Sequence, residues 1–168
     1  MESIFENVGK ELNWTQVQNI GYVLHAHDAQ TGIAVLQVQG VFGSKANGNC
    51  SDGAWEFKRV GMLQNSVSIQ SSGSSKQLAI FKKNKLNANG TLEFVGGKTV
   101  TVNRNTLMTE YNLLQENKVL VSFRHQQNRP QVFIDPAAMN MPELPLIVLF
   151  LGYLVIMQRI DARLNPLY

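Results

Sequence analysis

The stretch from Leu144 to Met157, which reads LPLIVLFLGYLVIM, decides the fold. It contains no charge, no amide and only one hydroxyl, that of Tyr153. As an α-helix it would be about 21 Å long, which is short of the roughly 30 Å hydrocarbon core of a bilayer. It is apolar on every side, so it does not suit a surface helix with one solvated face. The stretch therefore predicts a helix that is buried inside protein.

Residues on both sides of this stretch mark the ends of the helix. Pro142 and Pro145 fit in or before a first helical turn, where their missing N–H groups cost no hydrogen bond. Glu143 places negative charge at the positive end of the helix dipole, and Arg159 places positive charge at the other end. We therefore expect the central helix to occupy about residues 142–160.

Upstream of the helix, apolar residues recur with a period of two, which is typical of β-strands. Clusters of glycine, asparagine and serine separate the segments, as an antiparallel meander requires. About ten strands are expected, and a sheet of that size tends to close, which also removes its exposed edges. The fold class predicted is mainly β, a closed antiparallel β-barrel of about 10–12 strands around a buried hydrophobic C-terminal helix. The expected strands cover residues 22–26, 33–38, 55–60, 66–70, 77–81, 91–95, 99–103, 109–114, 119–124 and 131–134.

Two further segments complete the predicted arrangement. Ser3 and Glu6 have the spacing of a capping box, and the apolar residues that follow recur at helical intervals. They predict a short N-terminal helix over about residues 3–13. Residues 43–53, which read GSKANGNCSDG, are expected to form a flexible polar loop that carries Cys50.

Composition limits the class of protein. The 168 residues suit one domain, expected to span residues 1–168. The net charge is +3 and the isoelectric point is near 9.1, which permits contact with anionic lipid without requiring it. A single cysteine excludes an intramolecular disulfide. The first ten residues carry no apolar core of a secretory signal, so a cytoplasmic protein is expected.

Three motifs resemble those of a known family. They are GAWEFKR at residues 53–59, GTLEF at residues 90–94, and PELPL at residues 142–146, which runs into the apolar helix. On these motifs the chain resembles bacterial members of the Tubby C-terminal-like group, which includes Tubby proteins and phospholipid scramblases. The resemblance implies a β-barrel threaded by a hydrophobic C-terminal helix, and a non-catalytic module. Tubby domains tether to phosphoinositides and scramblases act on lipids with calcium, although no acidic loop with EF-hand spacing occurs here.

The densest basic cluster consists of Lys82, Lys83 and Lys85, just before a turn. On a hairpin tip, each lysine would contribute roughly 1 kcal/mol of attraction to a charged membrane surface. The alternative is a solubilising loop or a strand edge protected by lysines. Nucleic acid is not expected as a partner, because aromatic residues do not alternate with these charges. The lysines therefore predict a peripheral contact with anionic phospholipid.

His25 and His27 are the residues closest to a metal motif. Residues two apart on a strand point to the same face, so both imidazoles could bind one metal ion. His125 would be a third ligand from a distant part of the sequence. The alternative is a pair of histidines on the solvent face.

Cys50 is interpreted as an ordinary loop cysteine. A reactive cysteine needs positive charge around it, and the only cation near Cys50 in the sequence is Lys45. No nucleophile elbow, phosphate loop or dinucleotide fingerprint occurs, so no catalytic residue and no cofactor are expected.

Together these patterns predict a non-enzymatic binding or scaffold module whose partner is an anionic phospholipid surface or another protein. Two alternatives stay open at this stage. One is a small metal-dependent enzyme built on His25 and His27. The other is a tail-anchored membrane protein with the stretch from Leu144 to Met157 in lipid and Arg159 and Arg163 at the interface.

Overall fold

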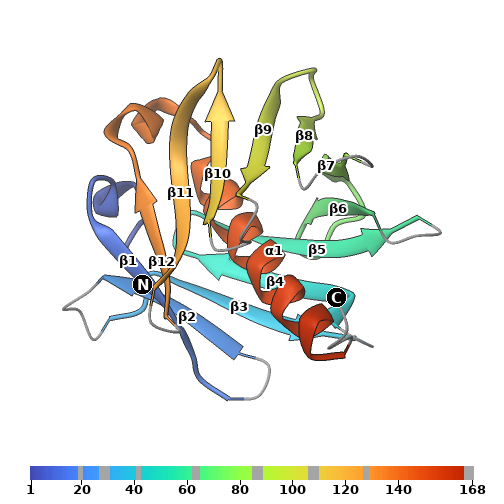
Figure 1. The fold of residues 1–168 in the computed structure, drawn as a ribbon, viewed down its shortest axis with the longest axis horizontal. Helices are drawn as coiled ribbons and strands as arrows, with labels where there is room; N and C mark the ends of the chain where they lie inside the picture. Colours follow the sequence, from blue (N-terminus) through green and yellow to red (C-terminus); the bar gives the residue numbers. More distant parts are fainter. Residues whose placement is uncertain are drawn as a thin grey trace.

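The computed structural model describes residues 1–18, 21–26, 31–40, 43–61, 65–84, 89–105, 110–126 and 129–164, without the side chains of residues 125, 126 and 129. Twelve antiparallel strands form a closed barrel, and one long helix, α1 (Leu144–Leu164), runs through it (Figure 1). The strands are β1 (Glu11–Gln16), β2 (Gly21–Ala26), β3 (Ala34–Gln39), β4 (Lys45–Cys50), β5 (Gly53–Val60), β6 (Ser66–Ser71), β7 (Gln77–Lys83), β8 (Gly90–Phe94), β9 (Thr99–Arg104), β10 (Glu110–Gln115), β11 (Lys118–Gln126) and β12 (Arg129–Ile134).

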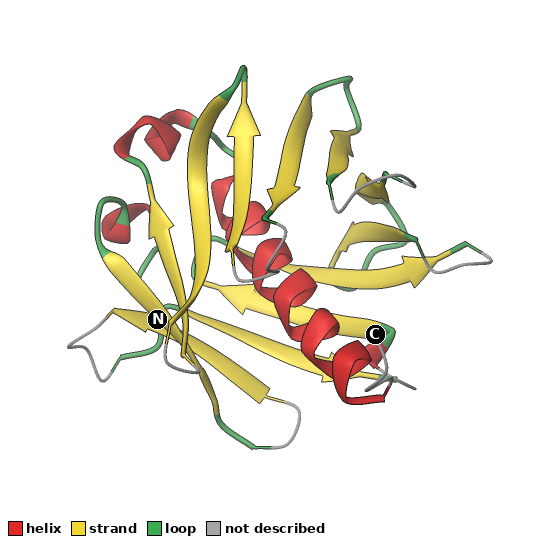
Figure 2. Ribbon diagram, in the orientation of Figure 1, coloured by secondary structure: helices red, strands yellow, loops and turns green. Residues whose placement is uncertain are grey.

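The topology is an up-and-down meander (Figure 2). Each strand pairs with the next along the chain, and β1 closes the barrel because it pairs with both β2 and β12. Successive side chains of a strand point to opposite faces, so alternate apolar residues fill the interior. In β3, for example, Leu36 and Val38 are buried while Gln37 and Gln39 are exposed. All ten expected strands are present, and the predicted fold class is confirmed.

The core consists of α1 and the inward side chains of the strands around it. Residues of α1 are buried on every side of the helix, as its uniform hydrophobicity predicts. The helix continues to Leu164, four residues beyond the expected limit of 160. Its buried residues are Leu144, Pro145, Leu146, Ile147, Val148, Leu149, Phe150, Leu151, Gly152, Tyr153, Val155, Ile156 and Met157.

The predicted N-terminal helix over residues 3–13 is wrong. A single 3-10 turn, Phe5–Asn7, is followed by β1. The capping contact exists, because the Ser3 N–H donates to Glu6 Oε2 at 3.2 Å. The helix stops because Gly9 takes a φ of +79° and donates its N–H to the Ile134 carbonyl at 2.9 Å. Pairing with β12 therefore replaces the further helical hydrogen bonds that the apolar spacing predicted.

The predicted flexible loop over residues 43–53 is also wrong, because most of it forms β4 and the start of β5. The inward residues of β4 are all small: Ala46, Gly48 and Cys50. A Cβ on Gly48 would lie 2.9 Å from Phe57 Cε2 and 3.3 Å from Leu149 Cδ2. Small residues are required here because α1 and a neighbouring aromatic ring occupy the space that larger side chains would need.

Candidate functional site

The rim of the barrel where α1 ends gathers charged side chains from distant parts of the sequence. In a meander the odd-numbered strands all run in one direction, so β5, β7 and β9 end at the same rim. Each of these strands carries a cationic residue at or next to its last position: Arg59, Lys83 and Arg104. The C-terminal half of α1 reaches the same rim and adds Asp161.

These residues border a cavity of about 230 Å³. Among the described residues, its lining combines three cations and one carboxylate with polar and apolar side chains, and these charges sum to +2. The polar and apolar lining residues are Asn65, Val67, Phe81, Val102, Tyr111, Tyr153, Leu154, Met157 and Gln158. The cavity is thus positively charged on one part of its wall and apolar on another, which is the chemistry of a site for a small anion.

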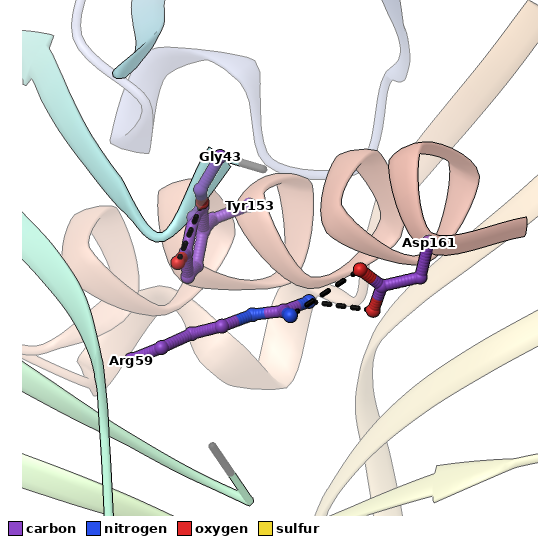
Figure 3. A network of polar contacts seen from close by, with 4 residues as sticks. All are labelled: Gly43, Arg59, Tyr153 and Asp161. Atoms are coloured by element: carbon purple, nitrogen blue, oxygen red, sulfur yellow. Dashed lines mark hydrogen bonds and ion pairs between the residues drawn. The ribbon is translucent and has the colours of Figure 1, made fainter. Parts of the chain in front are cut away.

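An ion pair joins the barrel wall to the end of α1 (Figure 3). Arg59 Nη2 lies 2.7 Å from Asp161 Oδ2, and Nη1 lies 3.3 Å from Oδ1. The side chain of Arg59 is 16% exposed and that of Asp161 is 46% exposed. The pair therefore presents two parallel N–H···O bonds at the border between the cavity and solvent.

Tyr153 lies beside this ion pair and fixes the helix against the β3–β4 connection. Its hydroxyl donates to the Gly43 carbonyl at 3.3 Å (Figure 3), and its ring stacks on Phe57 with centroids 5.5 Å apart. Burial raises the pKa of Tyr153 to about 12, and the nearby Arg59 charge opposes that rise. Tyr153 therefore remains a neutral hydrogen-bond donor over the physiological pH range.

Arg104, the last residue of β9, borders the same cavity. Its guanidinium carbon lies 6.0 Å from the centroid of the Tyr111 ring, within the range of a cation–π contact. Burial raises the pKa of Tyr111, and Arg104 opposes that rise. The Arg104 Nε atom is buried and has no hydrogen-bond partner within the described part of the chain. A buried donor of this kind favours an acceptor supplied by a ligand.

The predicted lysine cluster separates in the structure. Lys82 donates to Glu93 Oε2 at 2.8 Å, with both side chains about half exposed. Lys83, its neighbour on β7, borders the cavity. Lys85 lies outside the described residues. The two described lysines therefore have different surroundings. Lys82 is paired with a carboxylate, whereas Lys83 adds positive charge to the cavity.

The histidine prediction gains no geometric support. The His25 Nδ1 atom lies 3.1 Å from the Ala26 carbonyl oxygen, and Nε2 lies 2.6 Å from the Thr15 hydroxyl oxygen. Both ring nitrogens of His25 thus have protein partners. His27 and the His125 side chain lie outside the described residues, and among the residues that are described no three potential ligands gather around one point.

Cys50 differs from the prediction, because it is a buried residue of β4 and not part of a flexible loop. Burial raises the pKa of its thiol, and Sγ donates to Asp52 Oδ2 at 3.8 Å. A thiol that is buried beside a carboxylate is protonated at neutral pH and is a poor nucleophile. The structure therefore gives Cys50 a packing role.

Sequence reasoning missed Arg59, Arg104 and Asp161 as site residues. Only Lys83, named as part of a lysine cluster, was among the predicted residues that border the cavity. A usable signal was present, since cations stand at the ends of alternate predicted strands. In a meander such positions share one rim, so the position of each charge within its strand carried more information than the local charge density.

Comparisons with known proteins support the fold. No family model matches the chain, and no curated protein matches it. The chain is similar to an X-ray structure of a protein from Arabidopsis thaliana, with a TM-score of 0.59 and 11% sequence identity. The match covers 94% of this chain and 96% of that chain. The likeness therefore extends over nearly the whole barrel, and at this identity it shows the fold alone.

Proposed function

We propose that the protein is a non-enzymatic binding module of the Tubby-like kind, and that its ligand is a small phosphate-bearing anion. One observation carries the proposal: Arg59, Lys83 and Arg104 converge from three strands on one cavity, and the described residues that line it include a single carboxylate. Arginine forks match the geometry of phosphate oxygens, and lysine adds a point charge. The unpartnered, buried Arg104 Nε atom supplies a donor for such a ligand.

The size of the cavity limits the ligand. At about 230 Å³ it is smaller than the roughly 300–1,000 Å³ of pockets that enclose drug-sized molecules. It suits a phosphate with a small organic substituent and excludes a complete phospholipid. The same chemistry occurs in a free phosphate ester and in the headgroup of an anionic phospholipid. In the second case the exposed Lys82 and Lys83 of β7 would add attraction to the membrane surface.

The first test measures binding of glycerol 3-phosphate by isothermal titration calorimetry. Arg104→Gln should weaken binding roughly tenfold or more, because a hydrogen bond to a charged group contributes about 1.5–3 kcal/mol. Arg124→Gln is the matched control, since Arg124 lies on β11, is 59% exposed and pairs with Glu110 outside the cavity. Equal affinities of wild type, Arg104→Gln and Arg124→Gln would contradict the cavity as the site.

The second test distinguishes a free ester from a membrane headgroup. Vesicles of phosphatidylcholine alone are compared with vesicles that also contain phosphatidic acid, at low and high salt. Sedimentation with the anionic vesicles at low salt, lost at high salt and lost when Lys82, Lys83 and Lys85 are changed to Gln, would indicate a headgroup. Binding of glycerol 3-phosphate without vesicle binding would indicate a free phosphate ester.

A further inference from the structure

Asp161 is the only acidic side chain among the described residues that line the cavity. Its carboxylate accepts hydrogen bonds from both terminal nitrogens of Arg59, at 3.3 Å from Nη1 and 2.7 Å from Nη2. A phosphate ligand would use the same two donors, because carboxylate and phosphate both bind arginine through two parallel N–H···O bonds. In the structure, therefore, the Asp161 carboxylate is paired with one of the three cations that a ligand would use.

Asp161 lies on the most weakly held part of α1. The helix is buried up to Met157, and Tyr153 is fixed to the Gly43 carbonyl. From residue 158 onward the side chains are half-buried, and those of residues 162–164 are exposed. Arg59, in contrast, belongs to a barrel strand that is paired on both sides. The carboxylate can therefore leave the cavity while the residues up to Met157 stay buried, and the apolar contact that the helix end gives up is that of the half-buried Ile160.

We propose, on the basis of the function proposed above, that Asp161 is a built-in competitor of the ligand for Arg59. A phosphate-bearing ligand that binds the cavity displaces the Asp161 carboxylate, and the last turns of α1, residues 158–164, are released from the barrel wall. The displaced carboxylate is solvated at little cost, because 46% of the Asp161 side chain is already exposed. The two equilibria are linked, so a change at Asp161 that weakens the Arg59–Asp161 pair strengthens ligand binding by at most the same factor.

Asp161→Asn tests the competition, with glycerol 3-phosphate as the probe and calorimetry as the measurement. The substitution keeps the size of the side chain and removes the charge that competes for Arg59. A half-exposed ion pair is worth at most about a fivefold change in an equilibrium constant. We therefore expect Asp161→Asn to bind glycerol 3-phosphate roughly threefold to fivefold more tightly than wild type. Glu143→Gln is the matched control. It removes one negative charge at the opposite end of the same helix, where Glu143 pairs with Lys98 at 2.7 Å, and should leave the affinity unchanged.

Hydrogen exchange tests the release of the helix end. In wild type, saturating glycerol 3-phosphate should accelerate amide exchange in residues 158–164 while it slows exchange near Arg104. In Asp161→Asn the helix end should exchange fast even without ligand. Slower exchange of residues 158–164 in the liganded wild type would overturn the proposed release.

The outcomes separate this inference from the function on which it rests. Binding to Asp161→Asn that is equal to or weaker than wild type, with binding still weakened in Arg104→Gln, overturns the competitor role and leaves the anion site standing. Binding that does not respond to Arg104→Gln overturns the proposed site and the competitor role together. Tighter binding to Asp161→Asn, with Glu143→Gln unchanged, supports both.

Discussion

At the scale of single residues, Gly152 shows how closely α1 fits its surroundings. A Cβ at this position would lie 2.8 Å from Trp14 Cζ2 and 2.9 Å from Cε2. Trp14 belongs to β1 and is 2% exposed, so its indole has little space to retreat. The absence of a side chain at Gly152 therefore permits the close approach of β1.

Gly152→Ala should destabilise the protein by about 1–2 kcal/mol, because overpacking outweighs the roughly 1 kcal/mol gain in helix propensity. Urea unfolding measures the free energy. Phenylalanine has a smaller ring than tryptophan, so in a Trp14→Phe background the same substitution should lower the free energy of unfolding by less. The four proteins together form a double-mutant cycle. A stabilised Gly152→Ala protein would contradict the observed packing.

Tyr153 predicts how stability depends on alkaline pH. Its pKa rises from an ordinary value near 10 to about 12 in the folded protein. The folded state therefore keeps a proton that the unfolded state loses above about pH 10, so the stabilising contribution is complete below pH 10 and disappears as pH rises toward 12. The free energy of unfolding of Tyr153→Phe should fall less steeply between these pH values. Identical slopes for both proteins would show that Tyr153 does not ionise as inferred.

At the scale of elements, α1 is the central structural support of the barrel. Leu149 is fully buried and lies against Gly48 of β4. Leu149→Ala should lower the free energy of unfolding by about 2–5 kcal/mol. Leu149→Asp should abolish folding, because it buries an unpaired charge.

The matched control for Leu149→Asp is Ala162→Asp, on the exposed end of the same helix. It should change stability by only a few tenths of a kcal/mol, roughly, as expected for acidic residues near a helix C-terminus. Circular dichroism and thermal melting measure both variants. A soluble Leu149→Asp protein with the melting temperature of wild type would show that α1 is not the core.

Two elements, β1 and β4, show where local patterns mislead. Leu12 of β1 continues the helical spacing of the preceding apolar residues, yet its partner in the barrel is Val132 of β12. The β4 sequence KANGNC has the composition of a loop, yet Gly48 and Cys50 face α1 and the core. In both cases a tertiary contact outweighs weak local propensity.

At the scale of the whole molecule, the barrel decides the environment of α1. The helix has 21 residues, about 32 Å in length, so by length and composition it is able to cross a membrane. In the structure 72% of its most apolar 18-residue stretch is buried in protein. The closed strands thus supply the apolar surroundings that a bilayer would otherwise provide.

Fractionation tests this arrangement against the tail-anchored alternative. The full-length protein should be recovered in the soluble fraction without detergent, because the apolar surface of α1 is covered by the barrel. Alkaline carbonate extraction should release any protein that sediments with membranes through charge alone. Recovery only after detergent extraction would indicate that α1 leaves the barrel and enters lipid.

The sequence by itself determined the elements whose signals are local. The uniform hydrophobicity from Leu144 to Met157 requires burial on all sides, and the period of two upstream produces strands that can supply it. Only the tertiary structure decided that Arg59, Lys83, Arg104 and Asp161 meet. Their meeting depends on strand direction, on register and on the point where α1 ends, and none of these is a property of neighbouring residues. The cations at the ends of alternate strands hint at a shared rim, but a candidate site assembled from four elements is complete only once the barrel has closed.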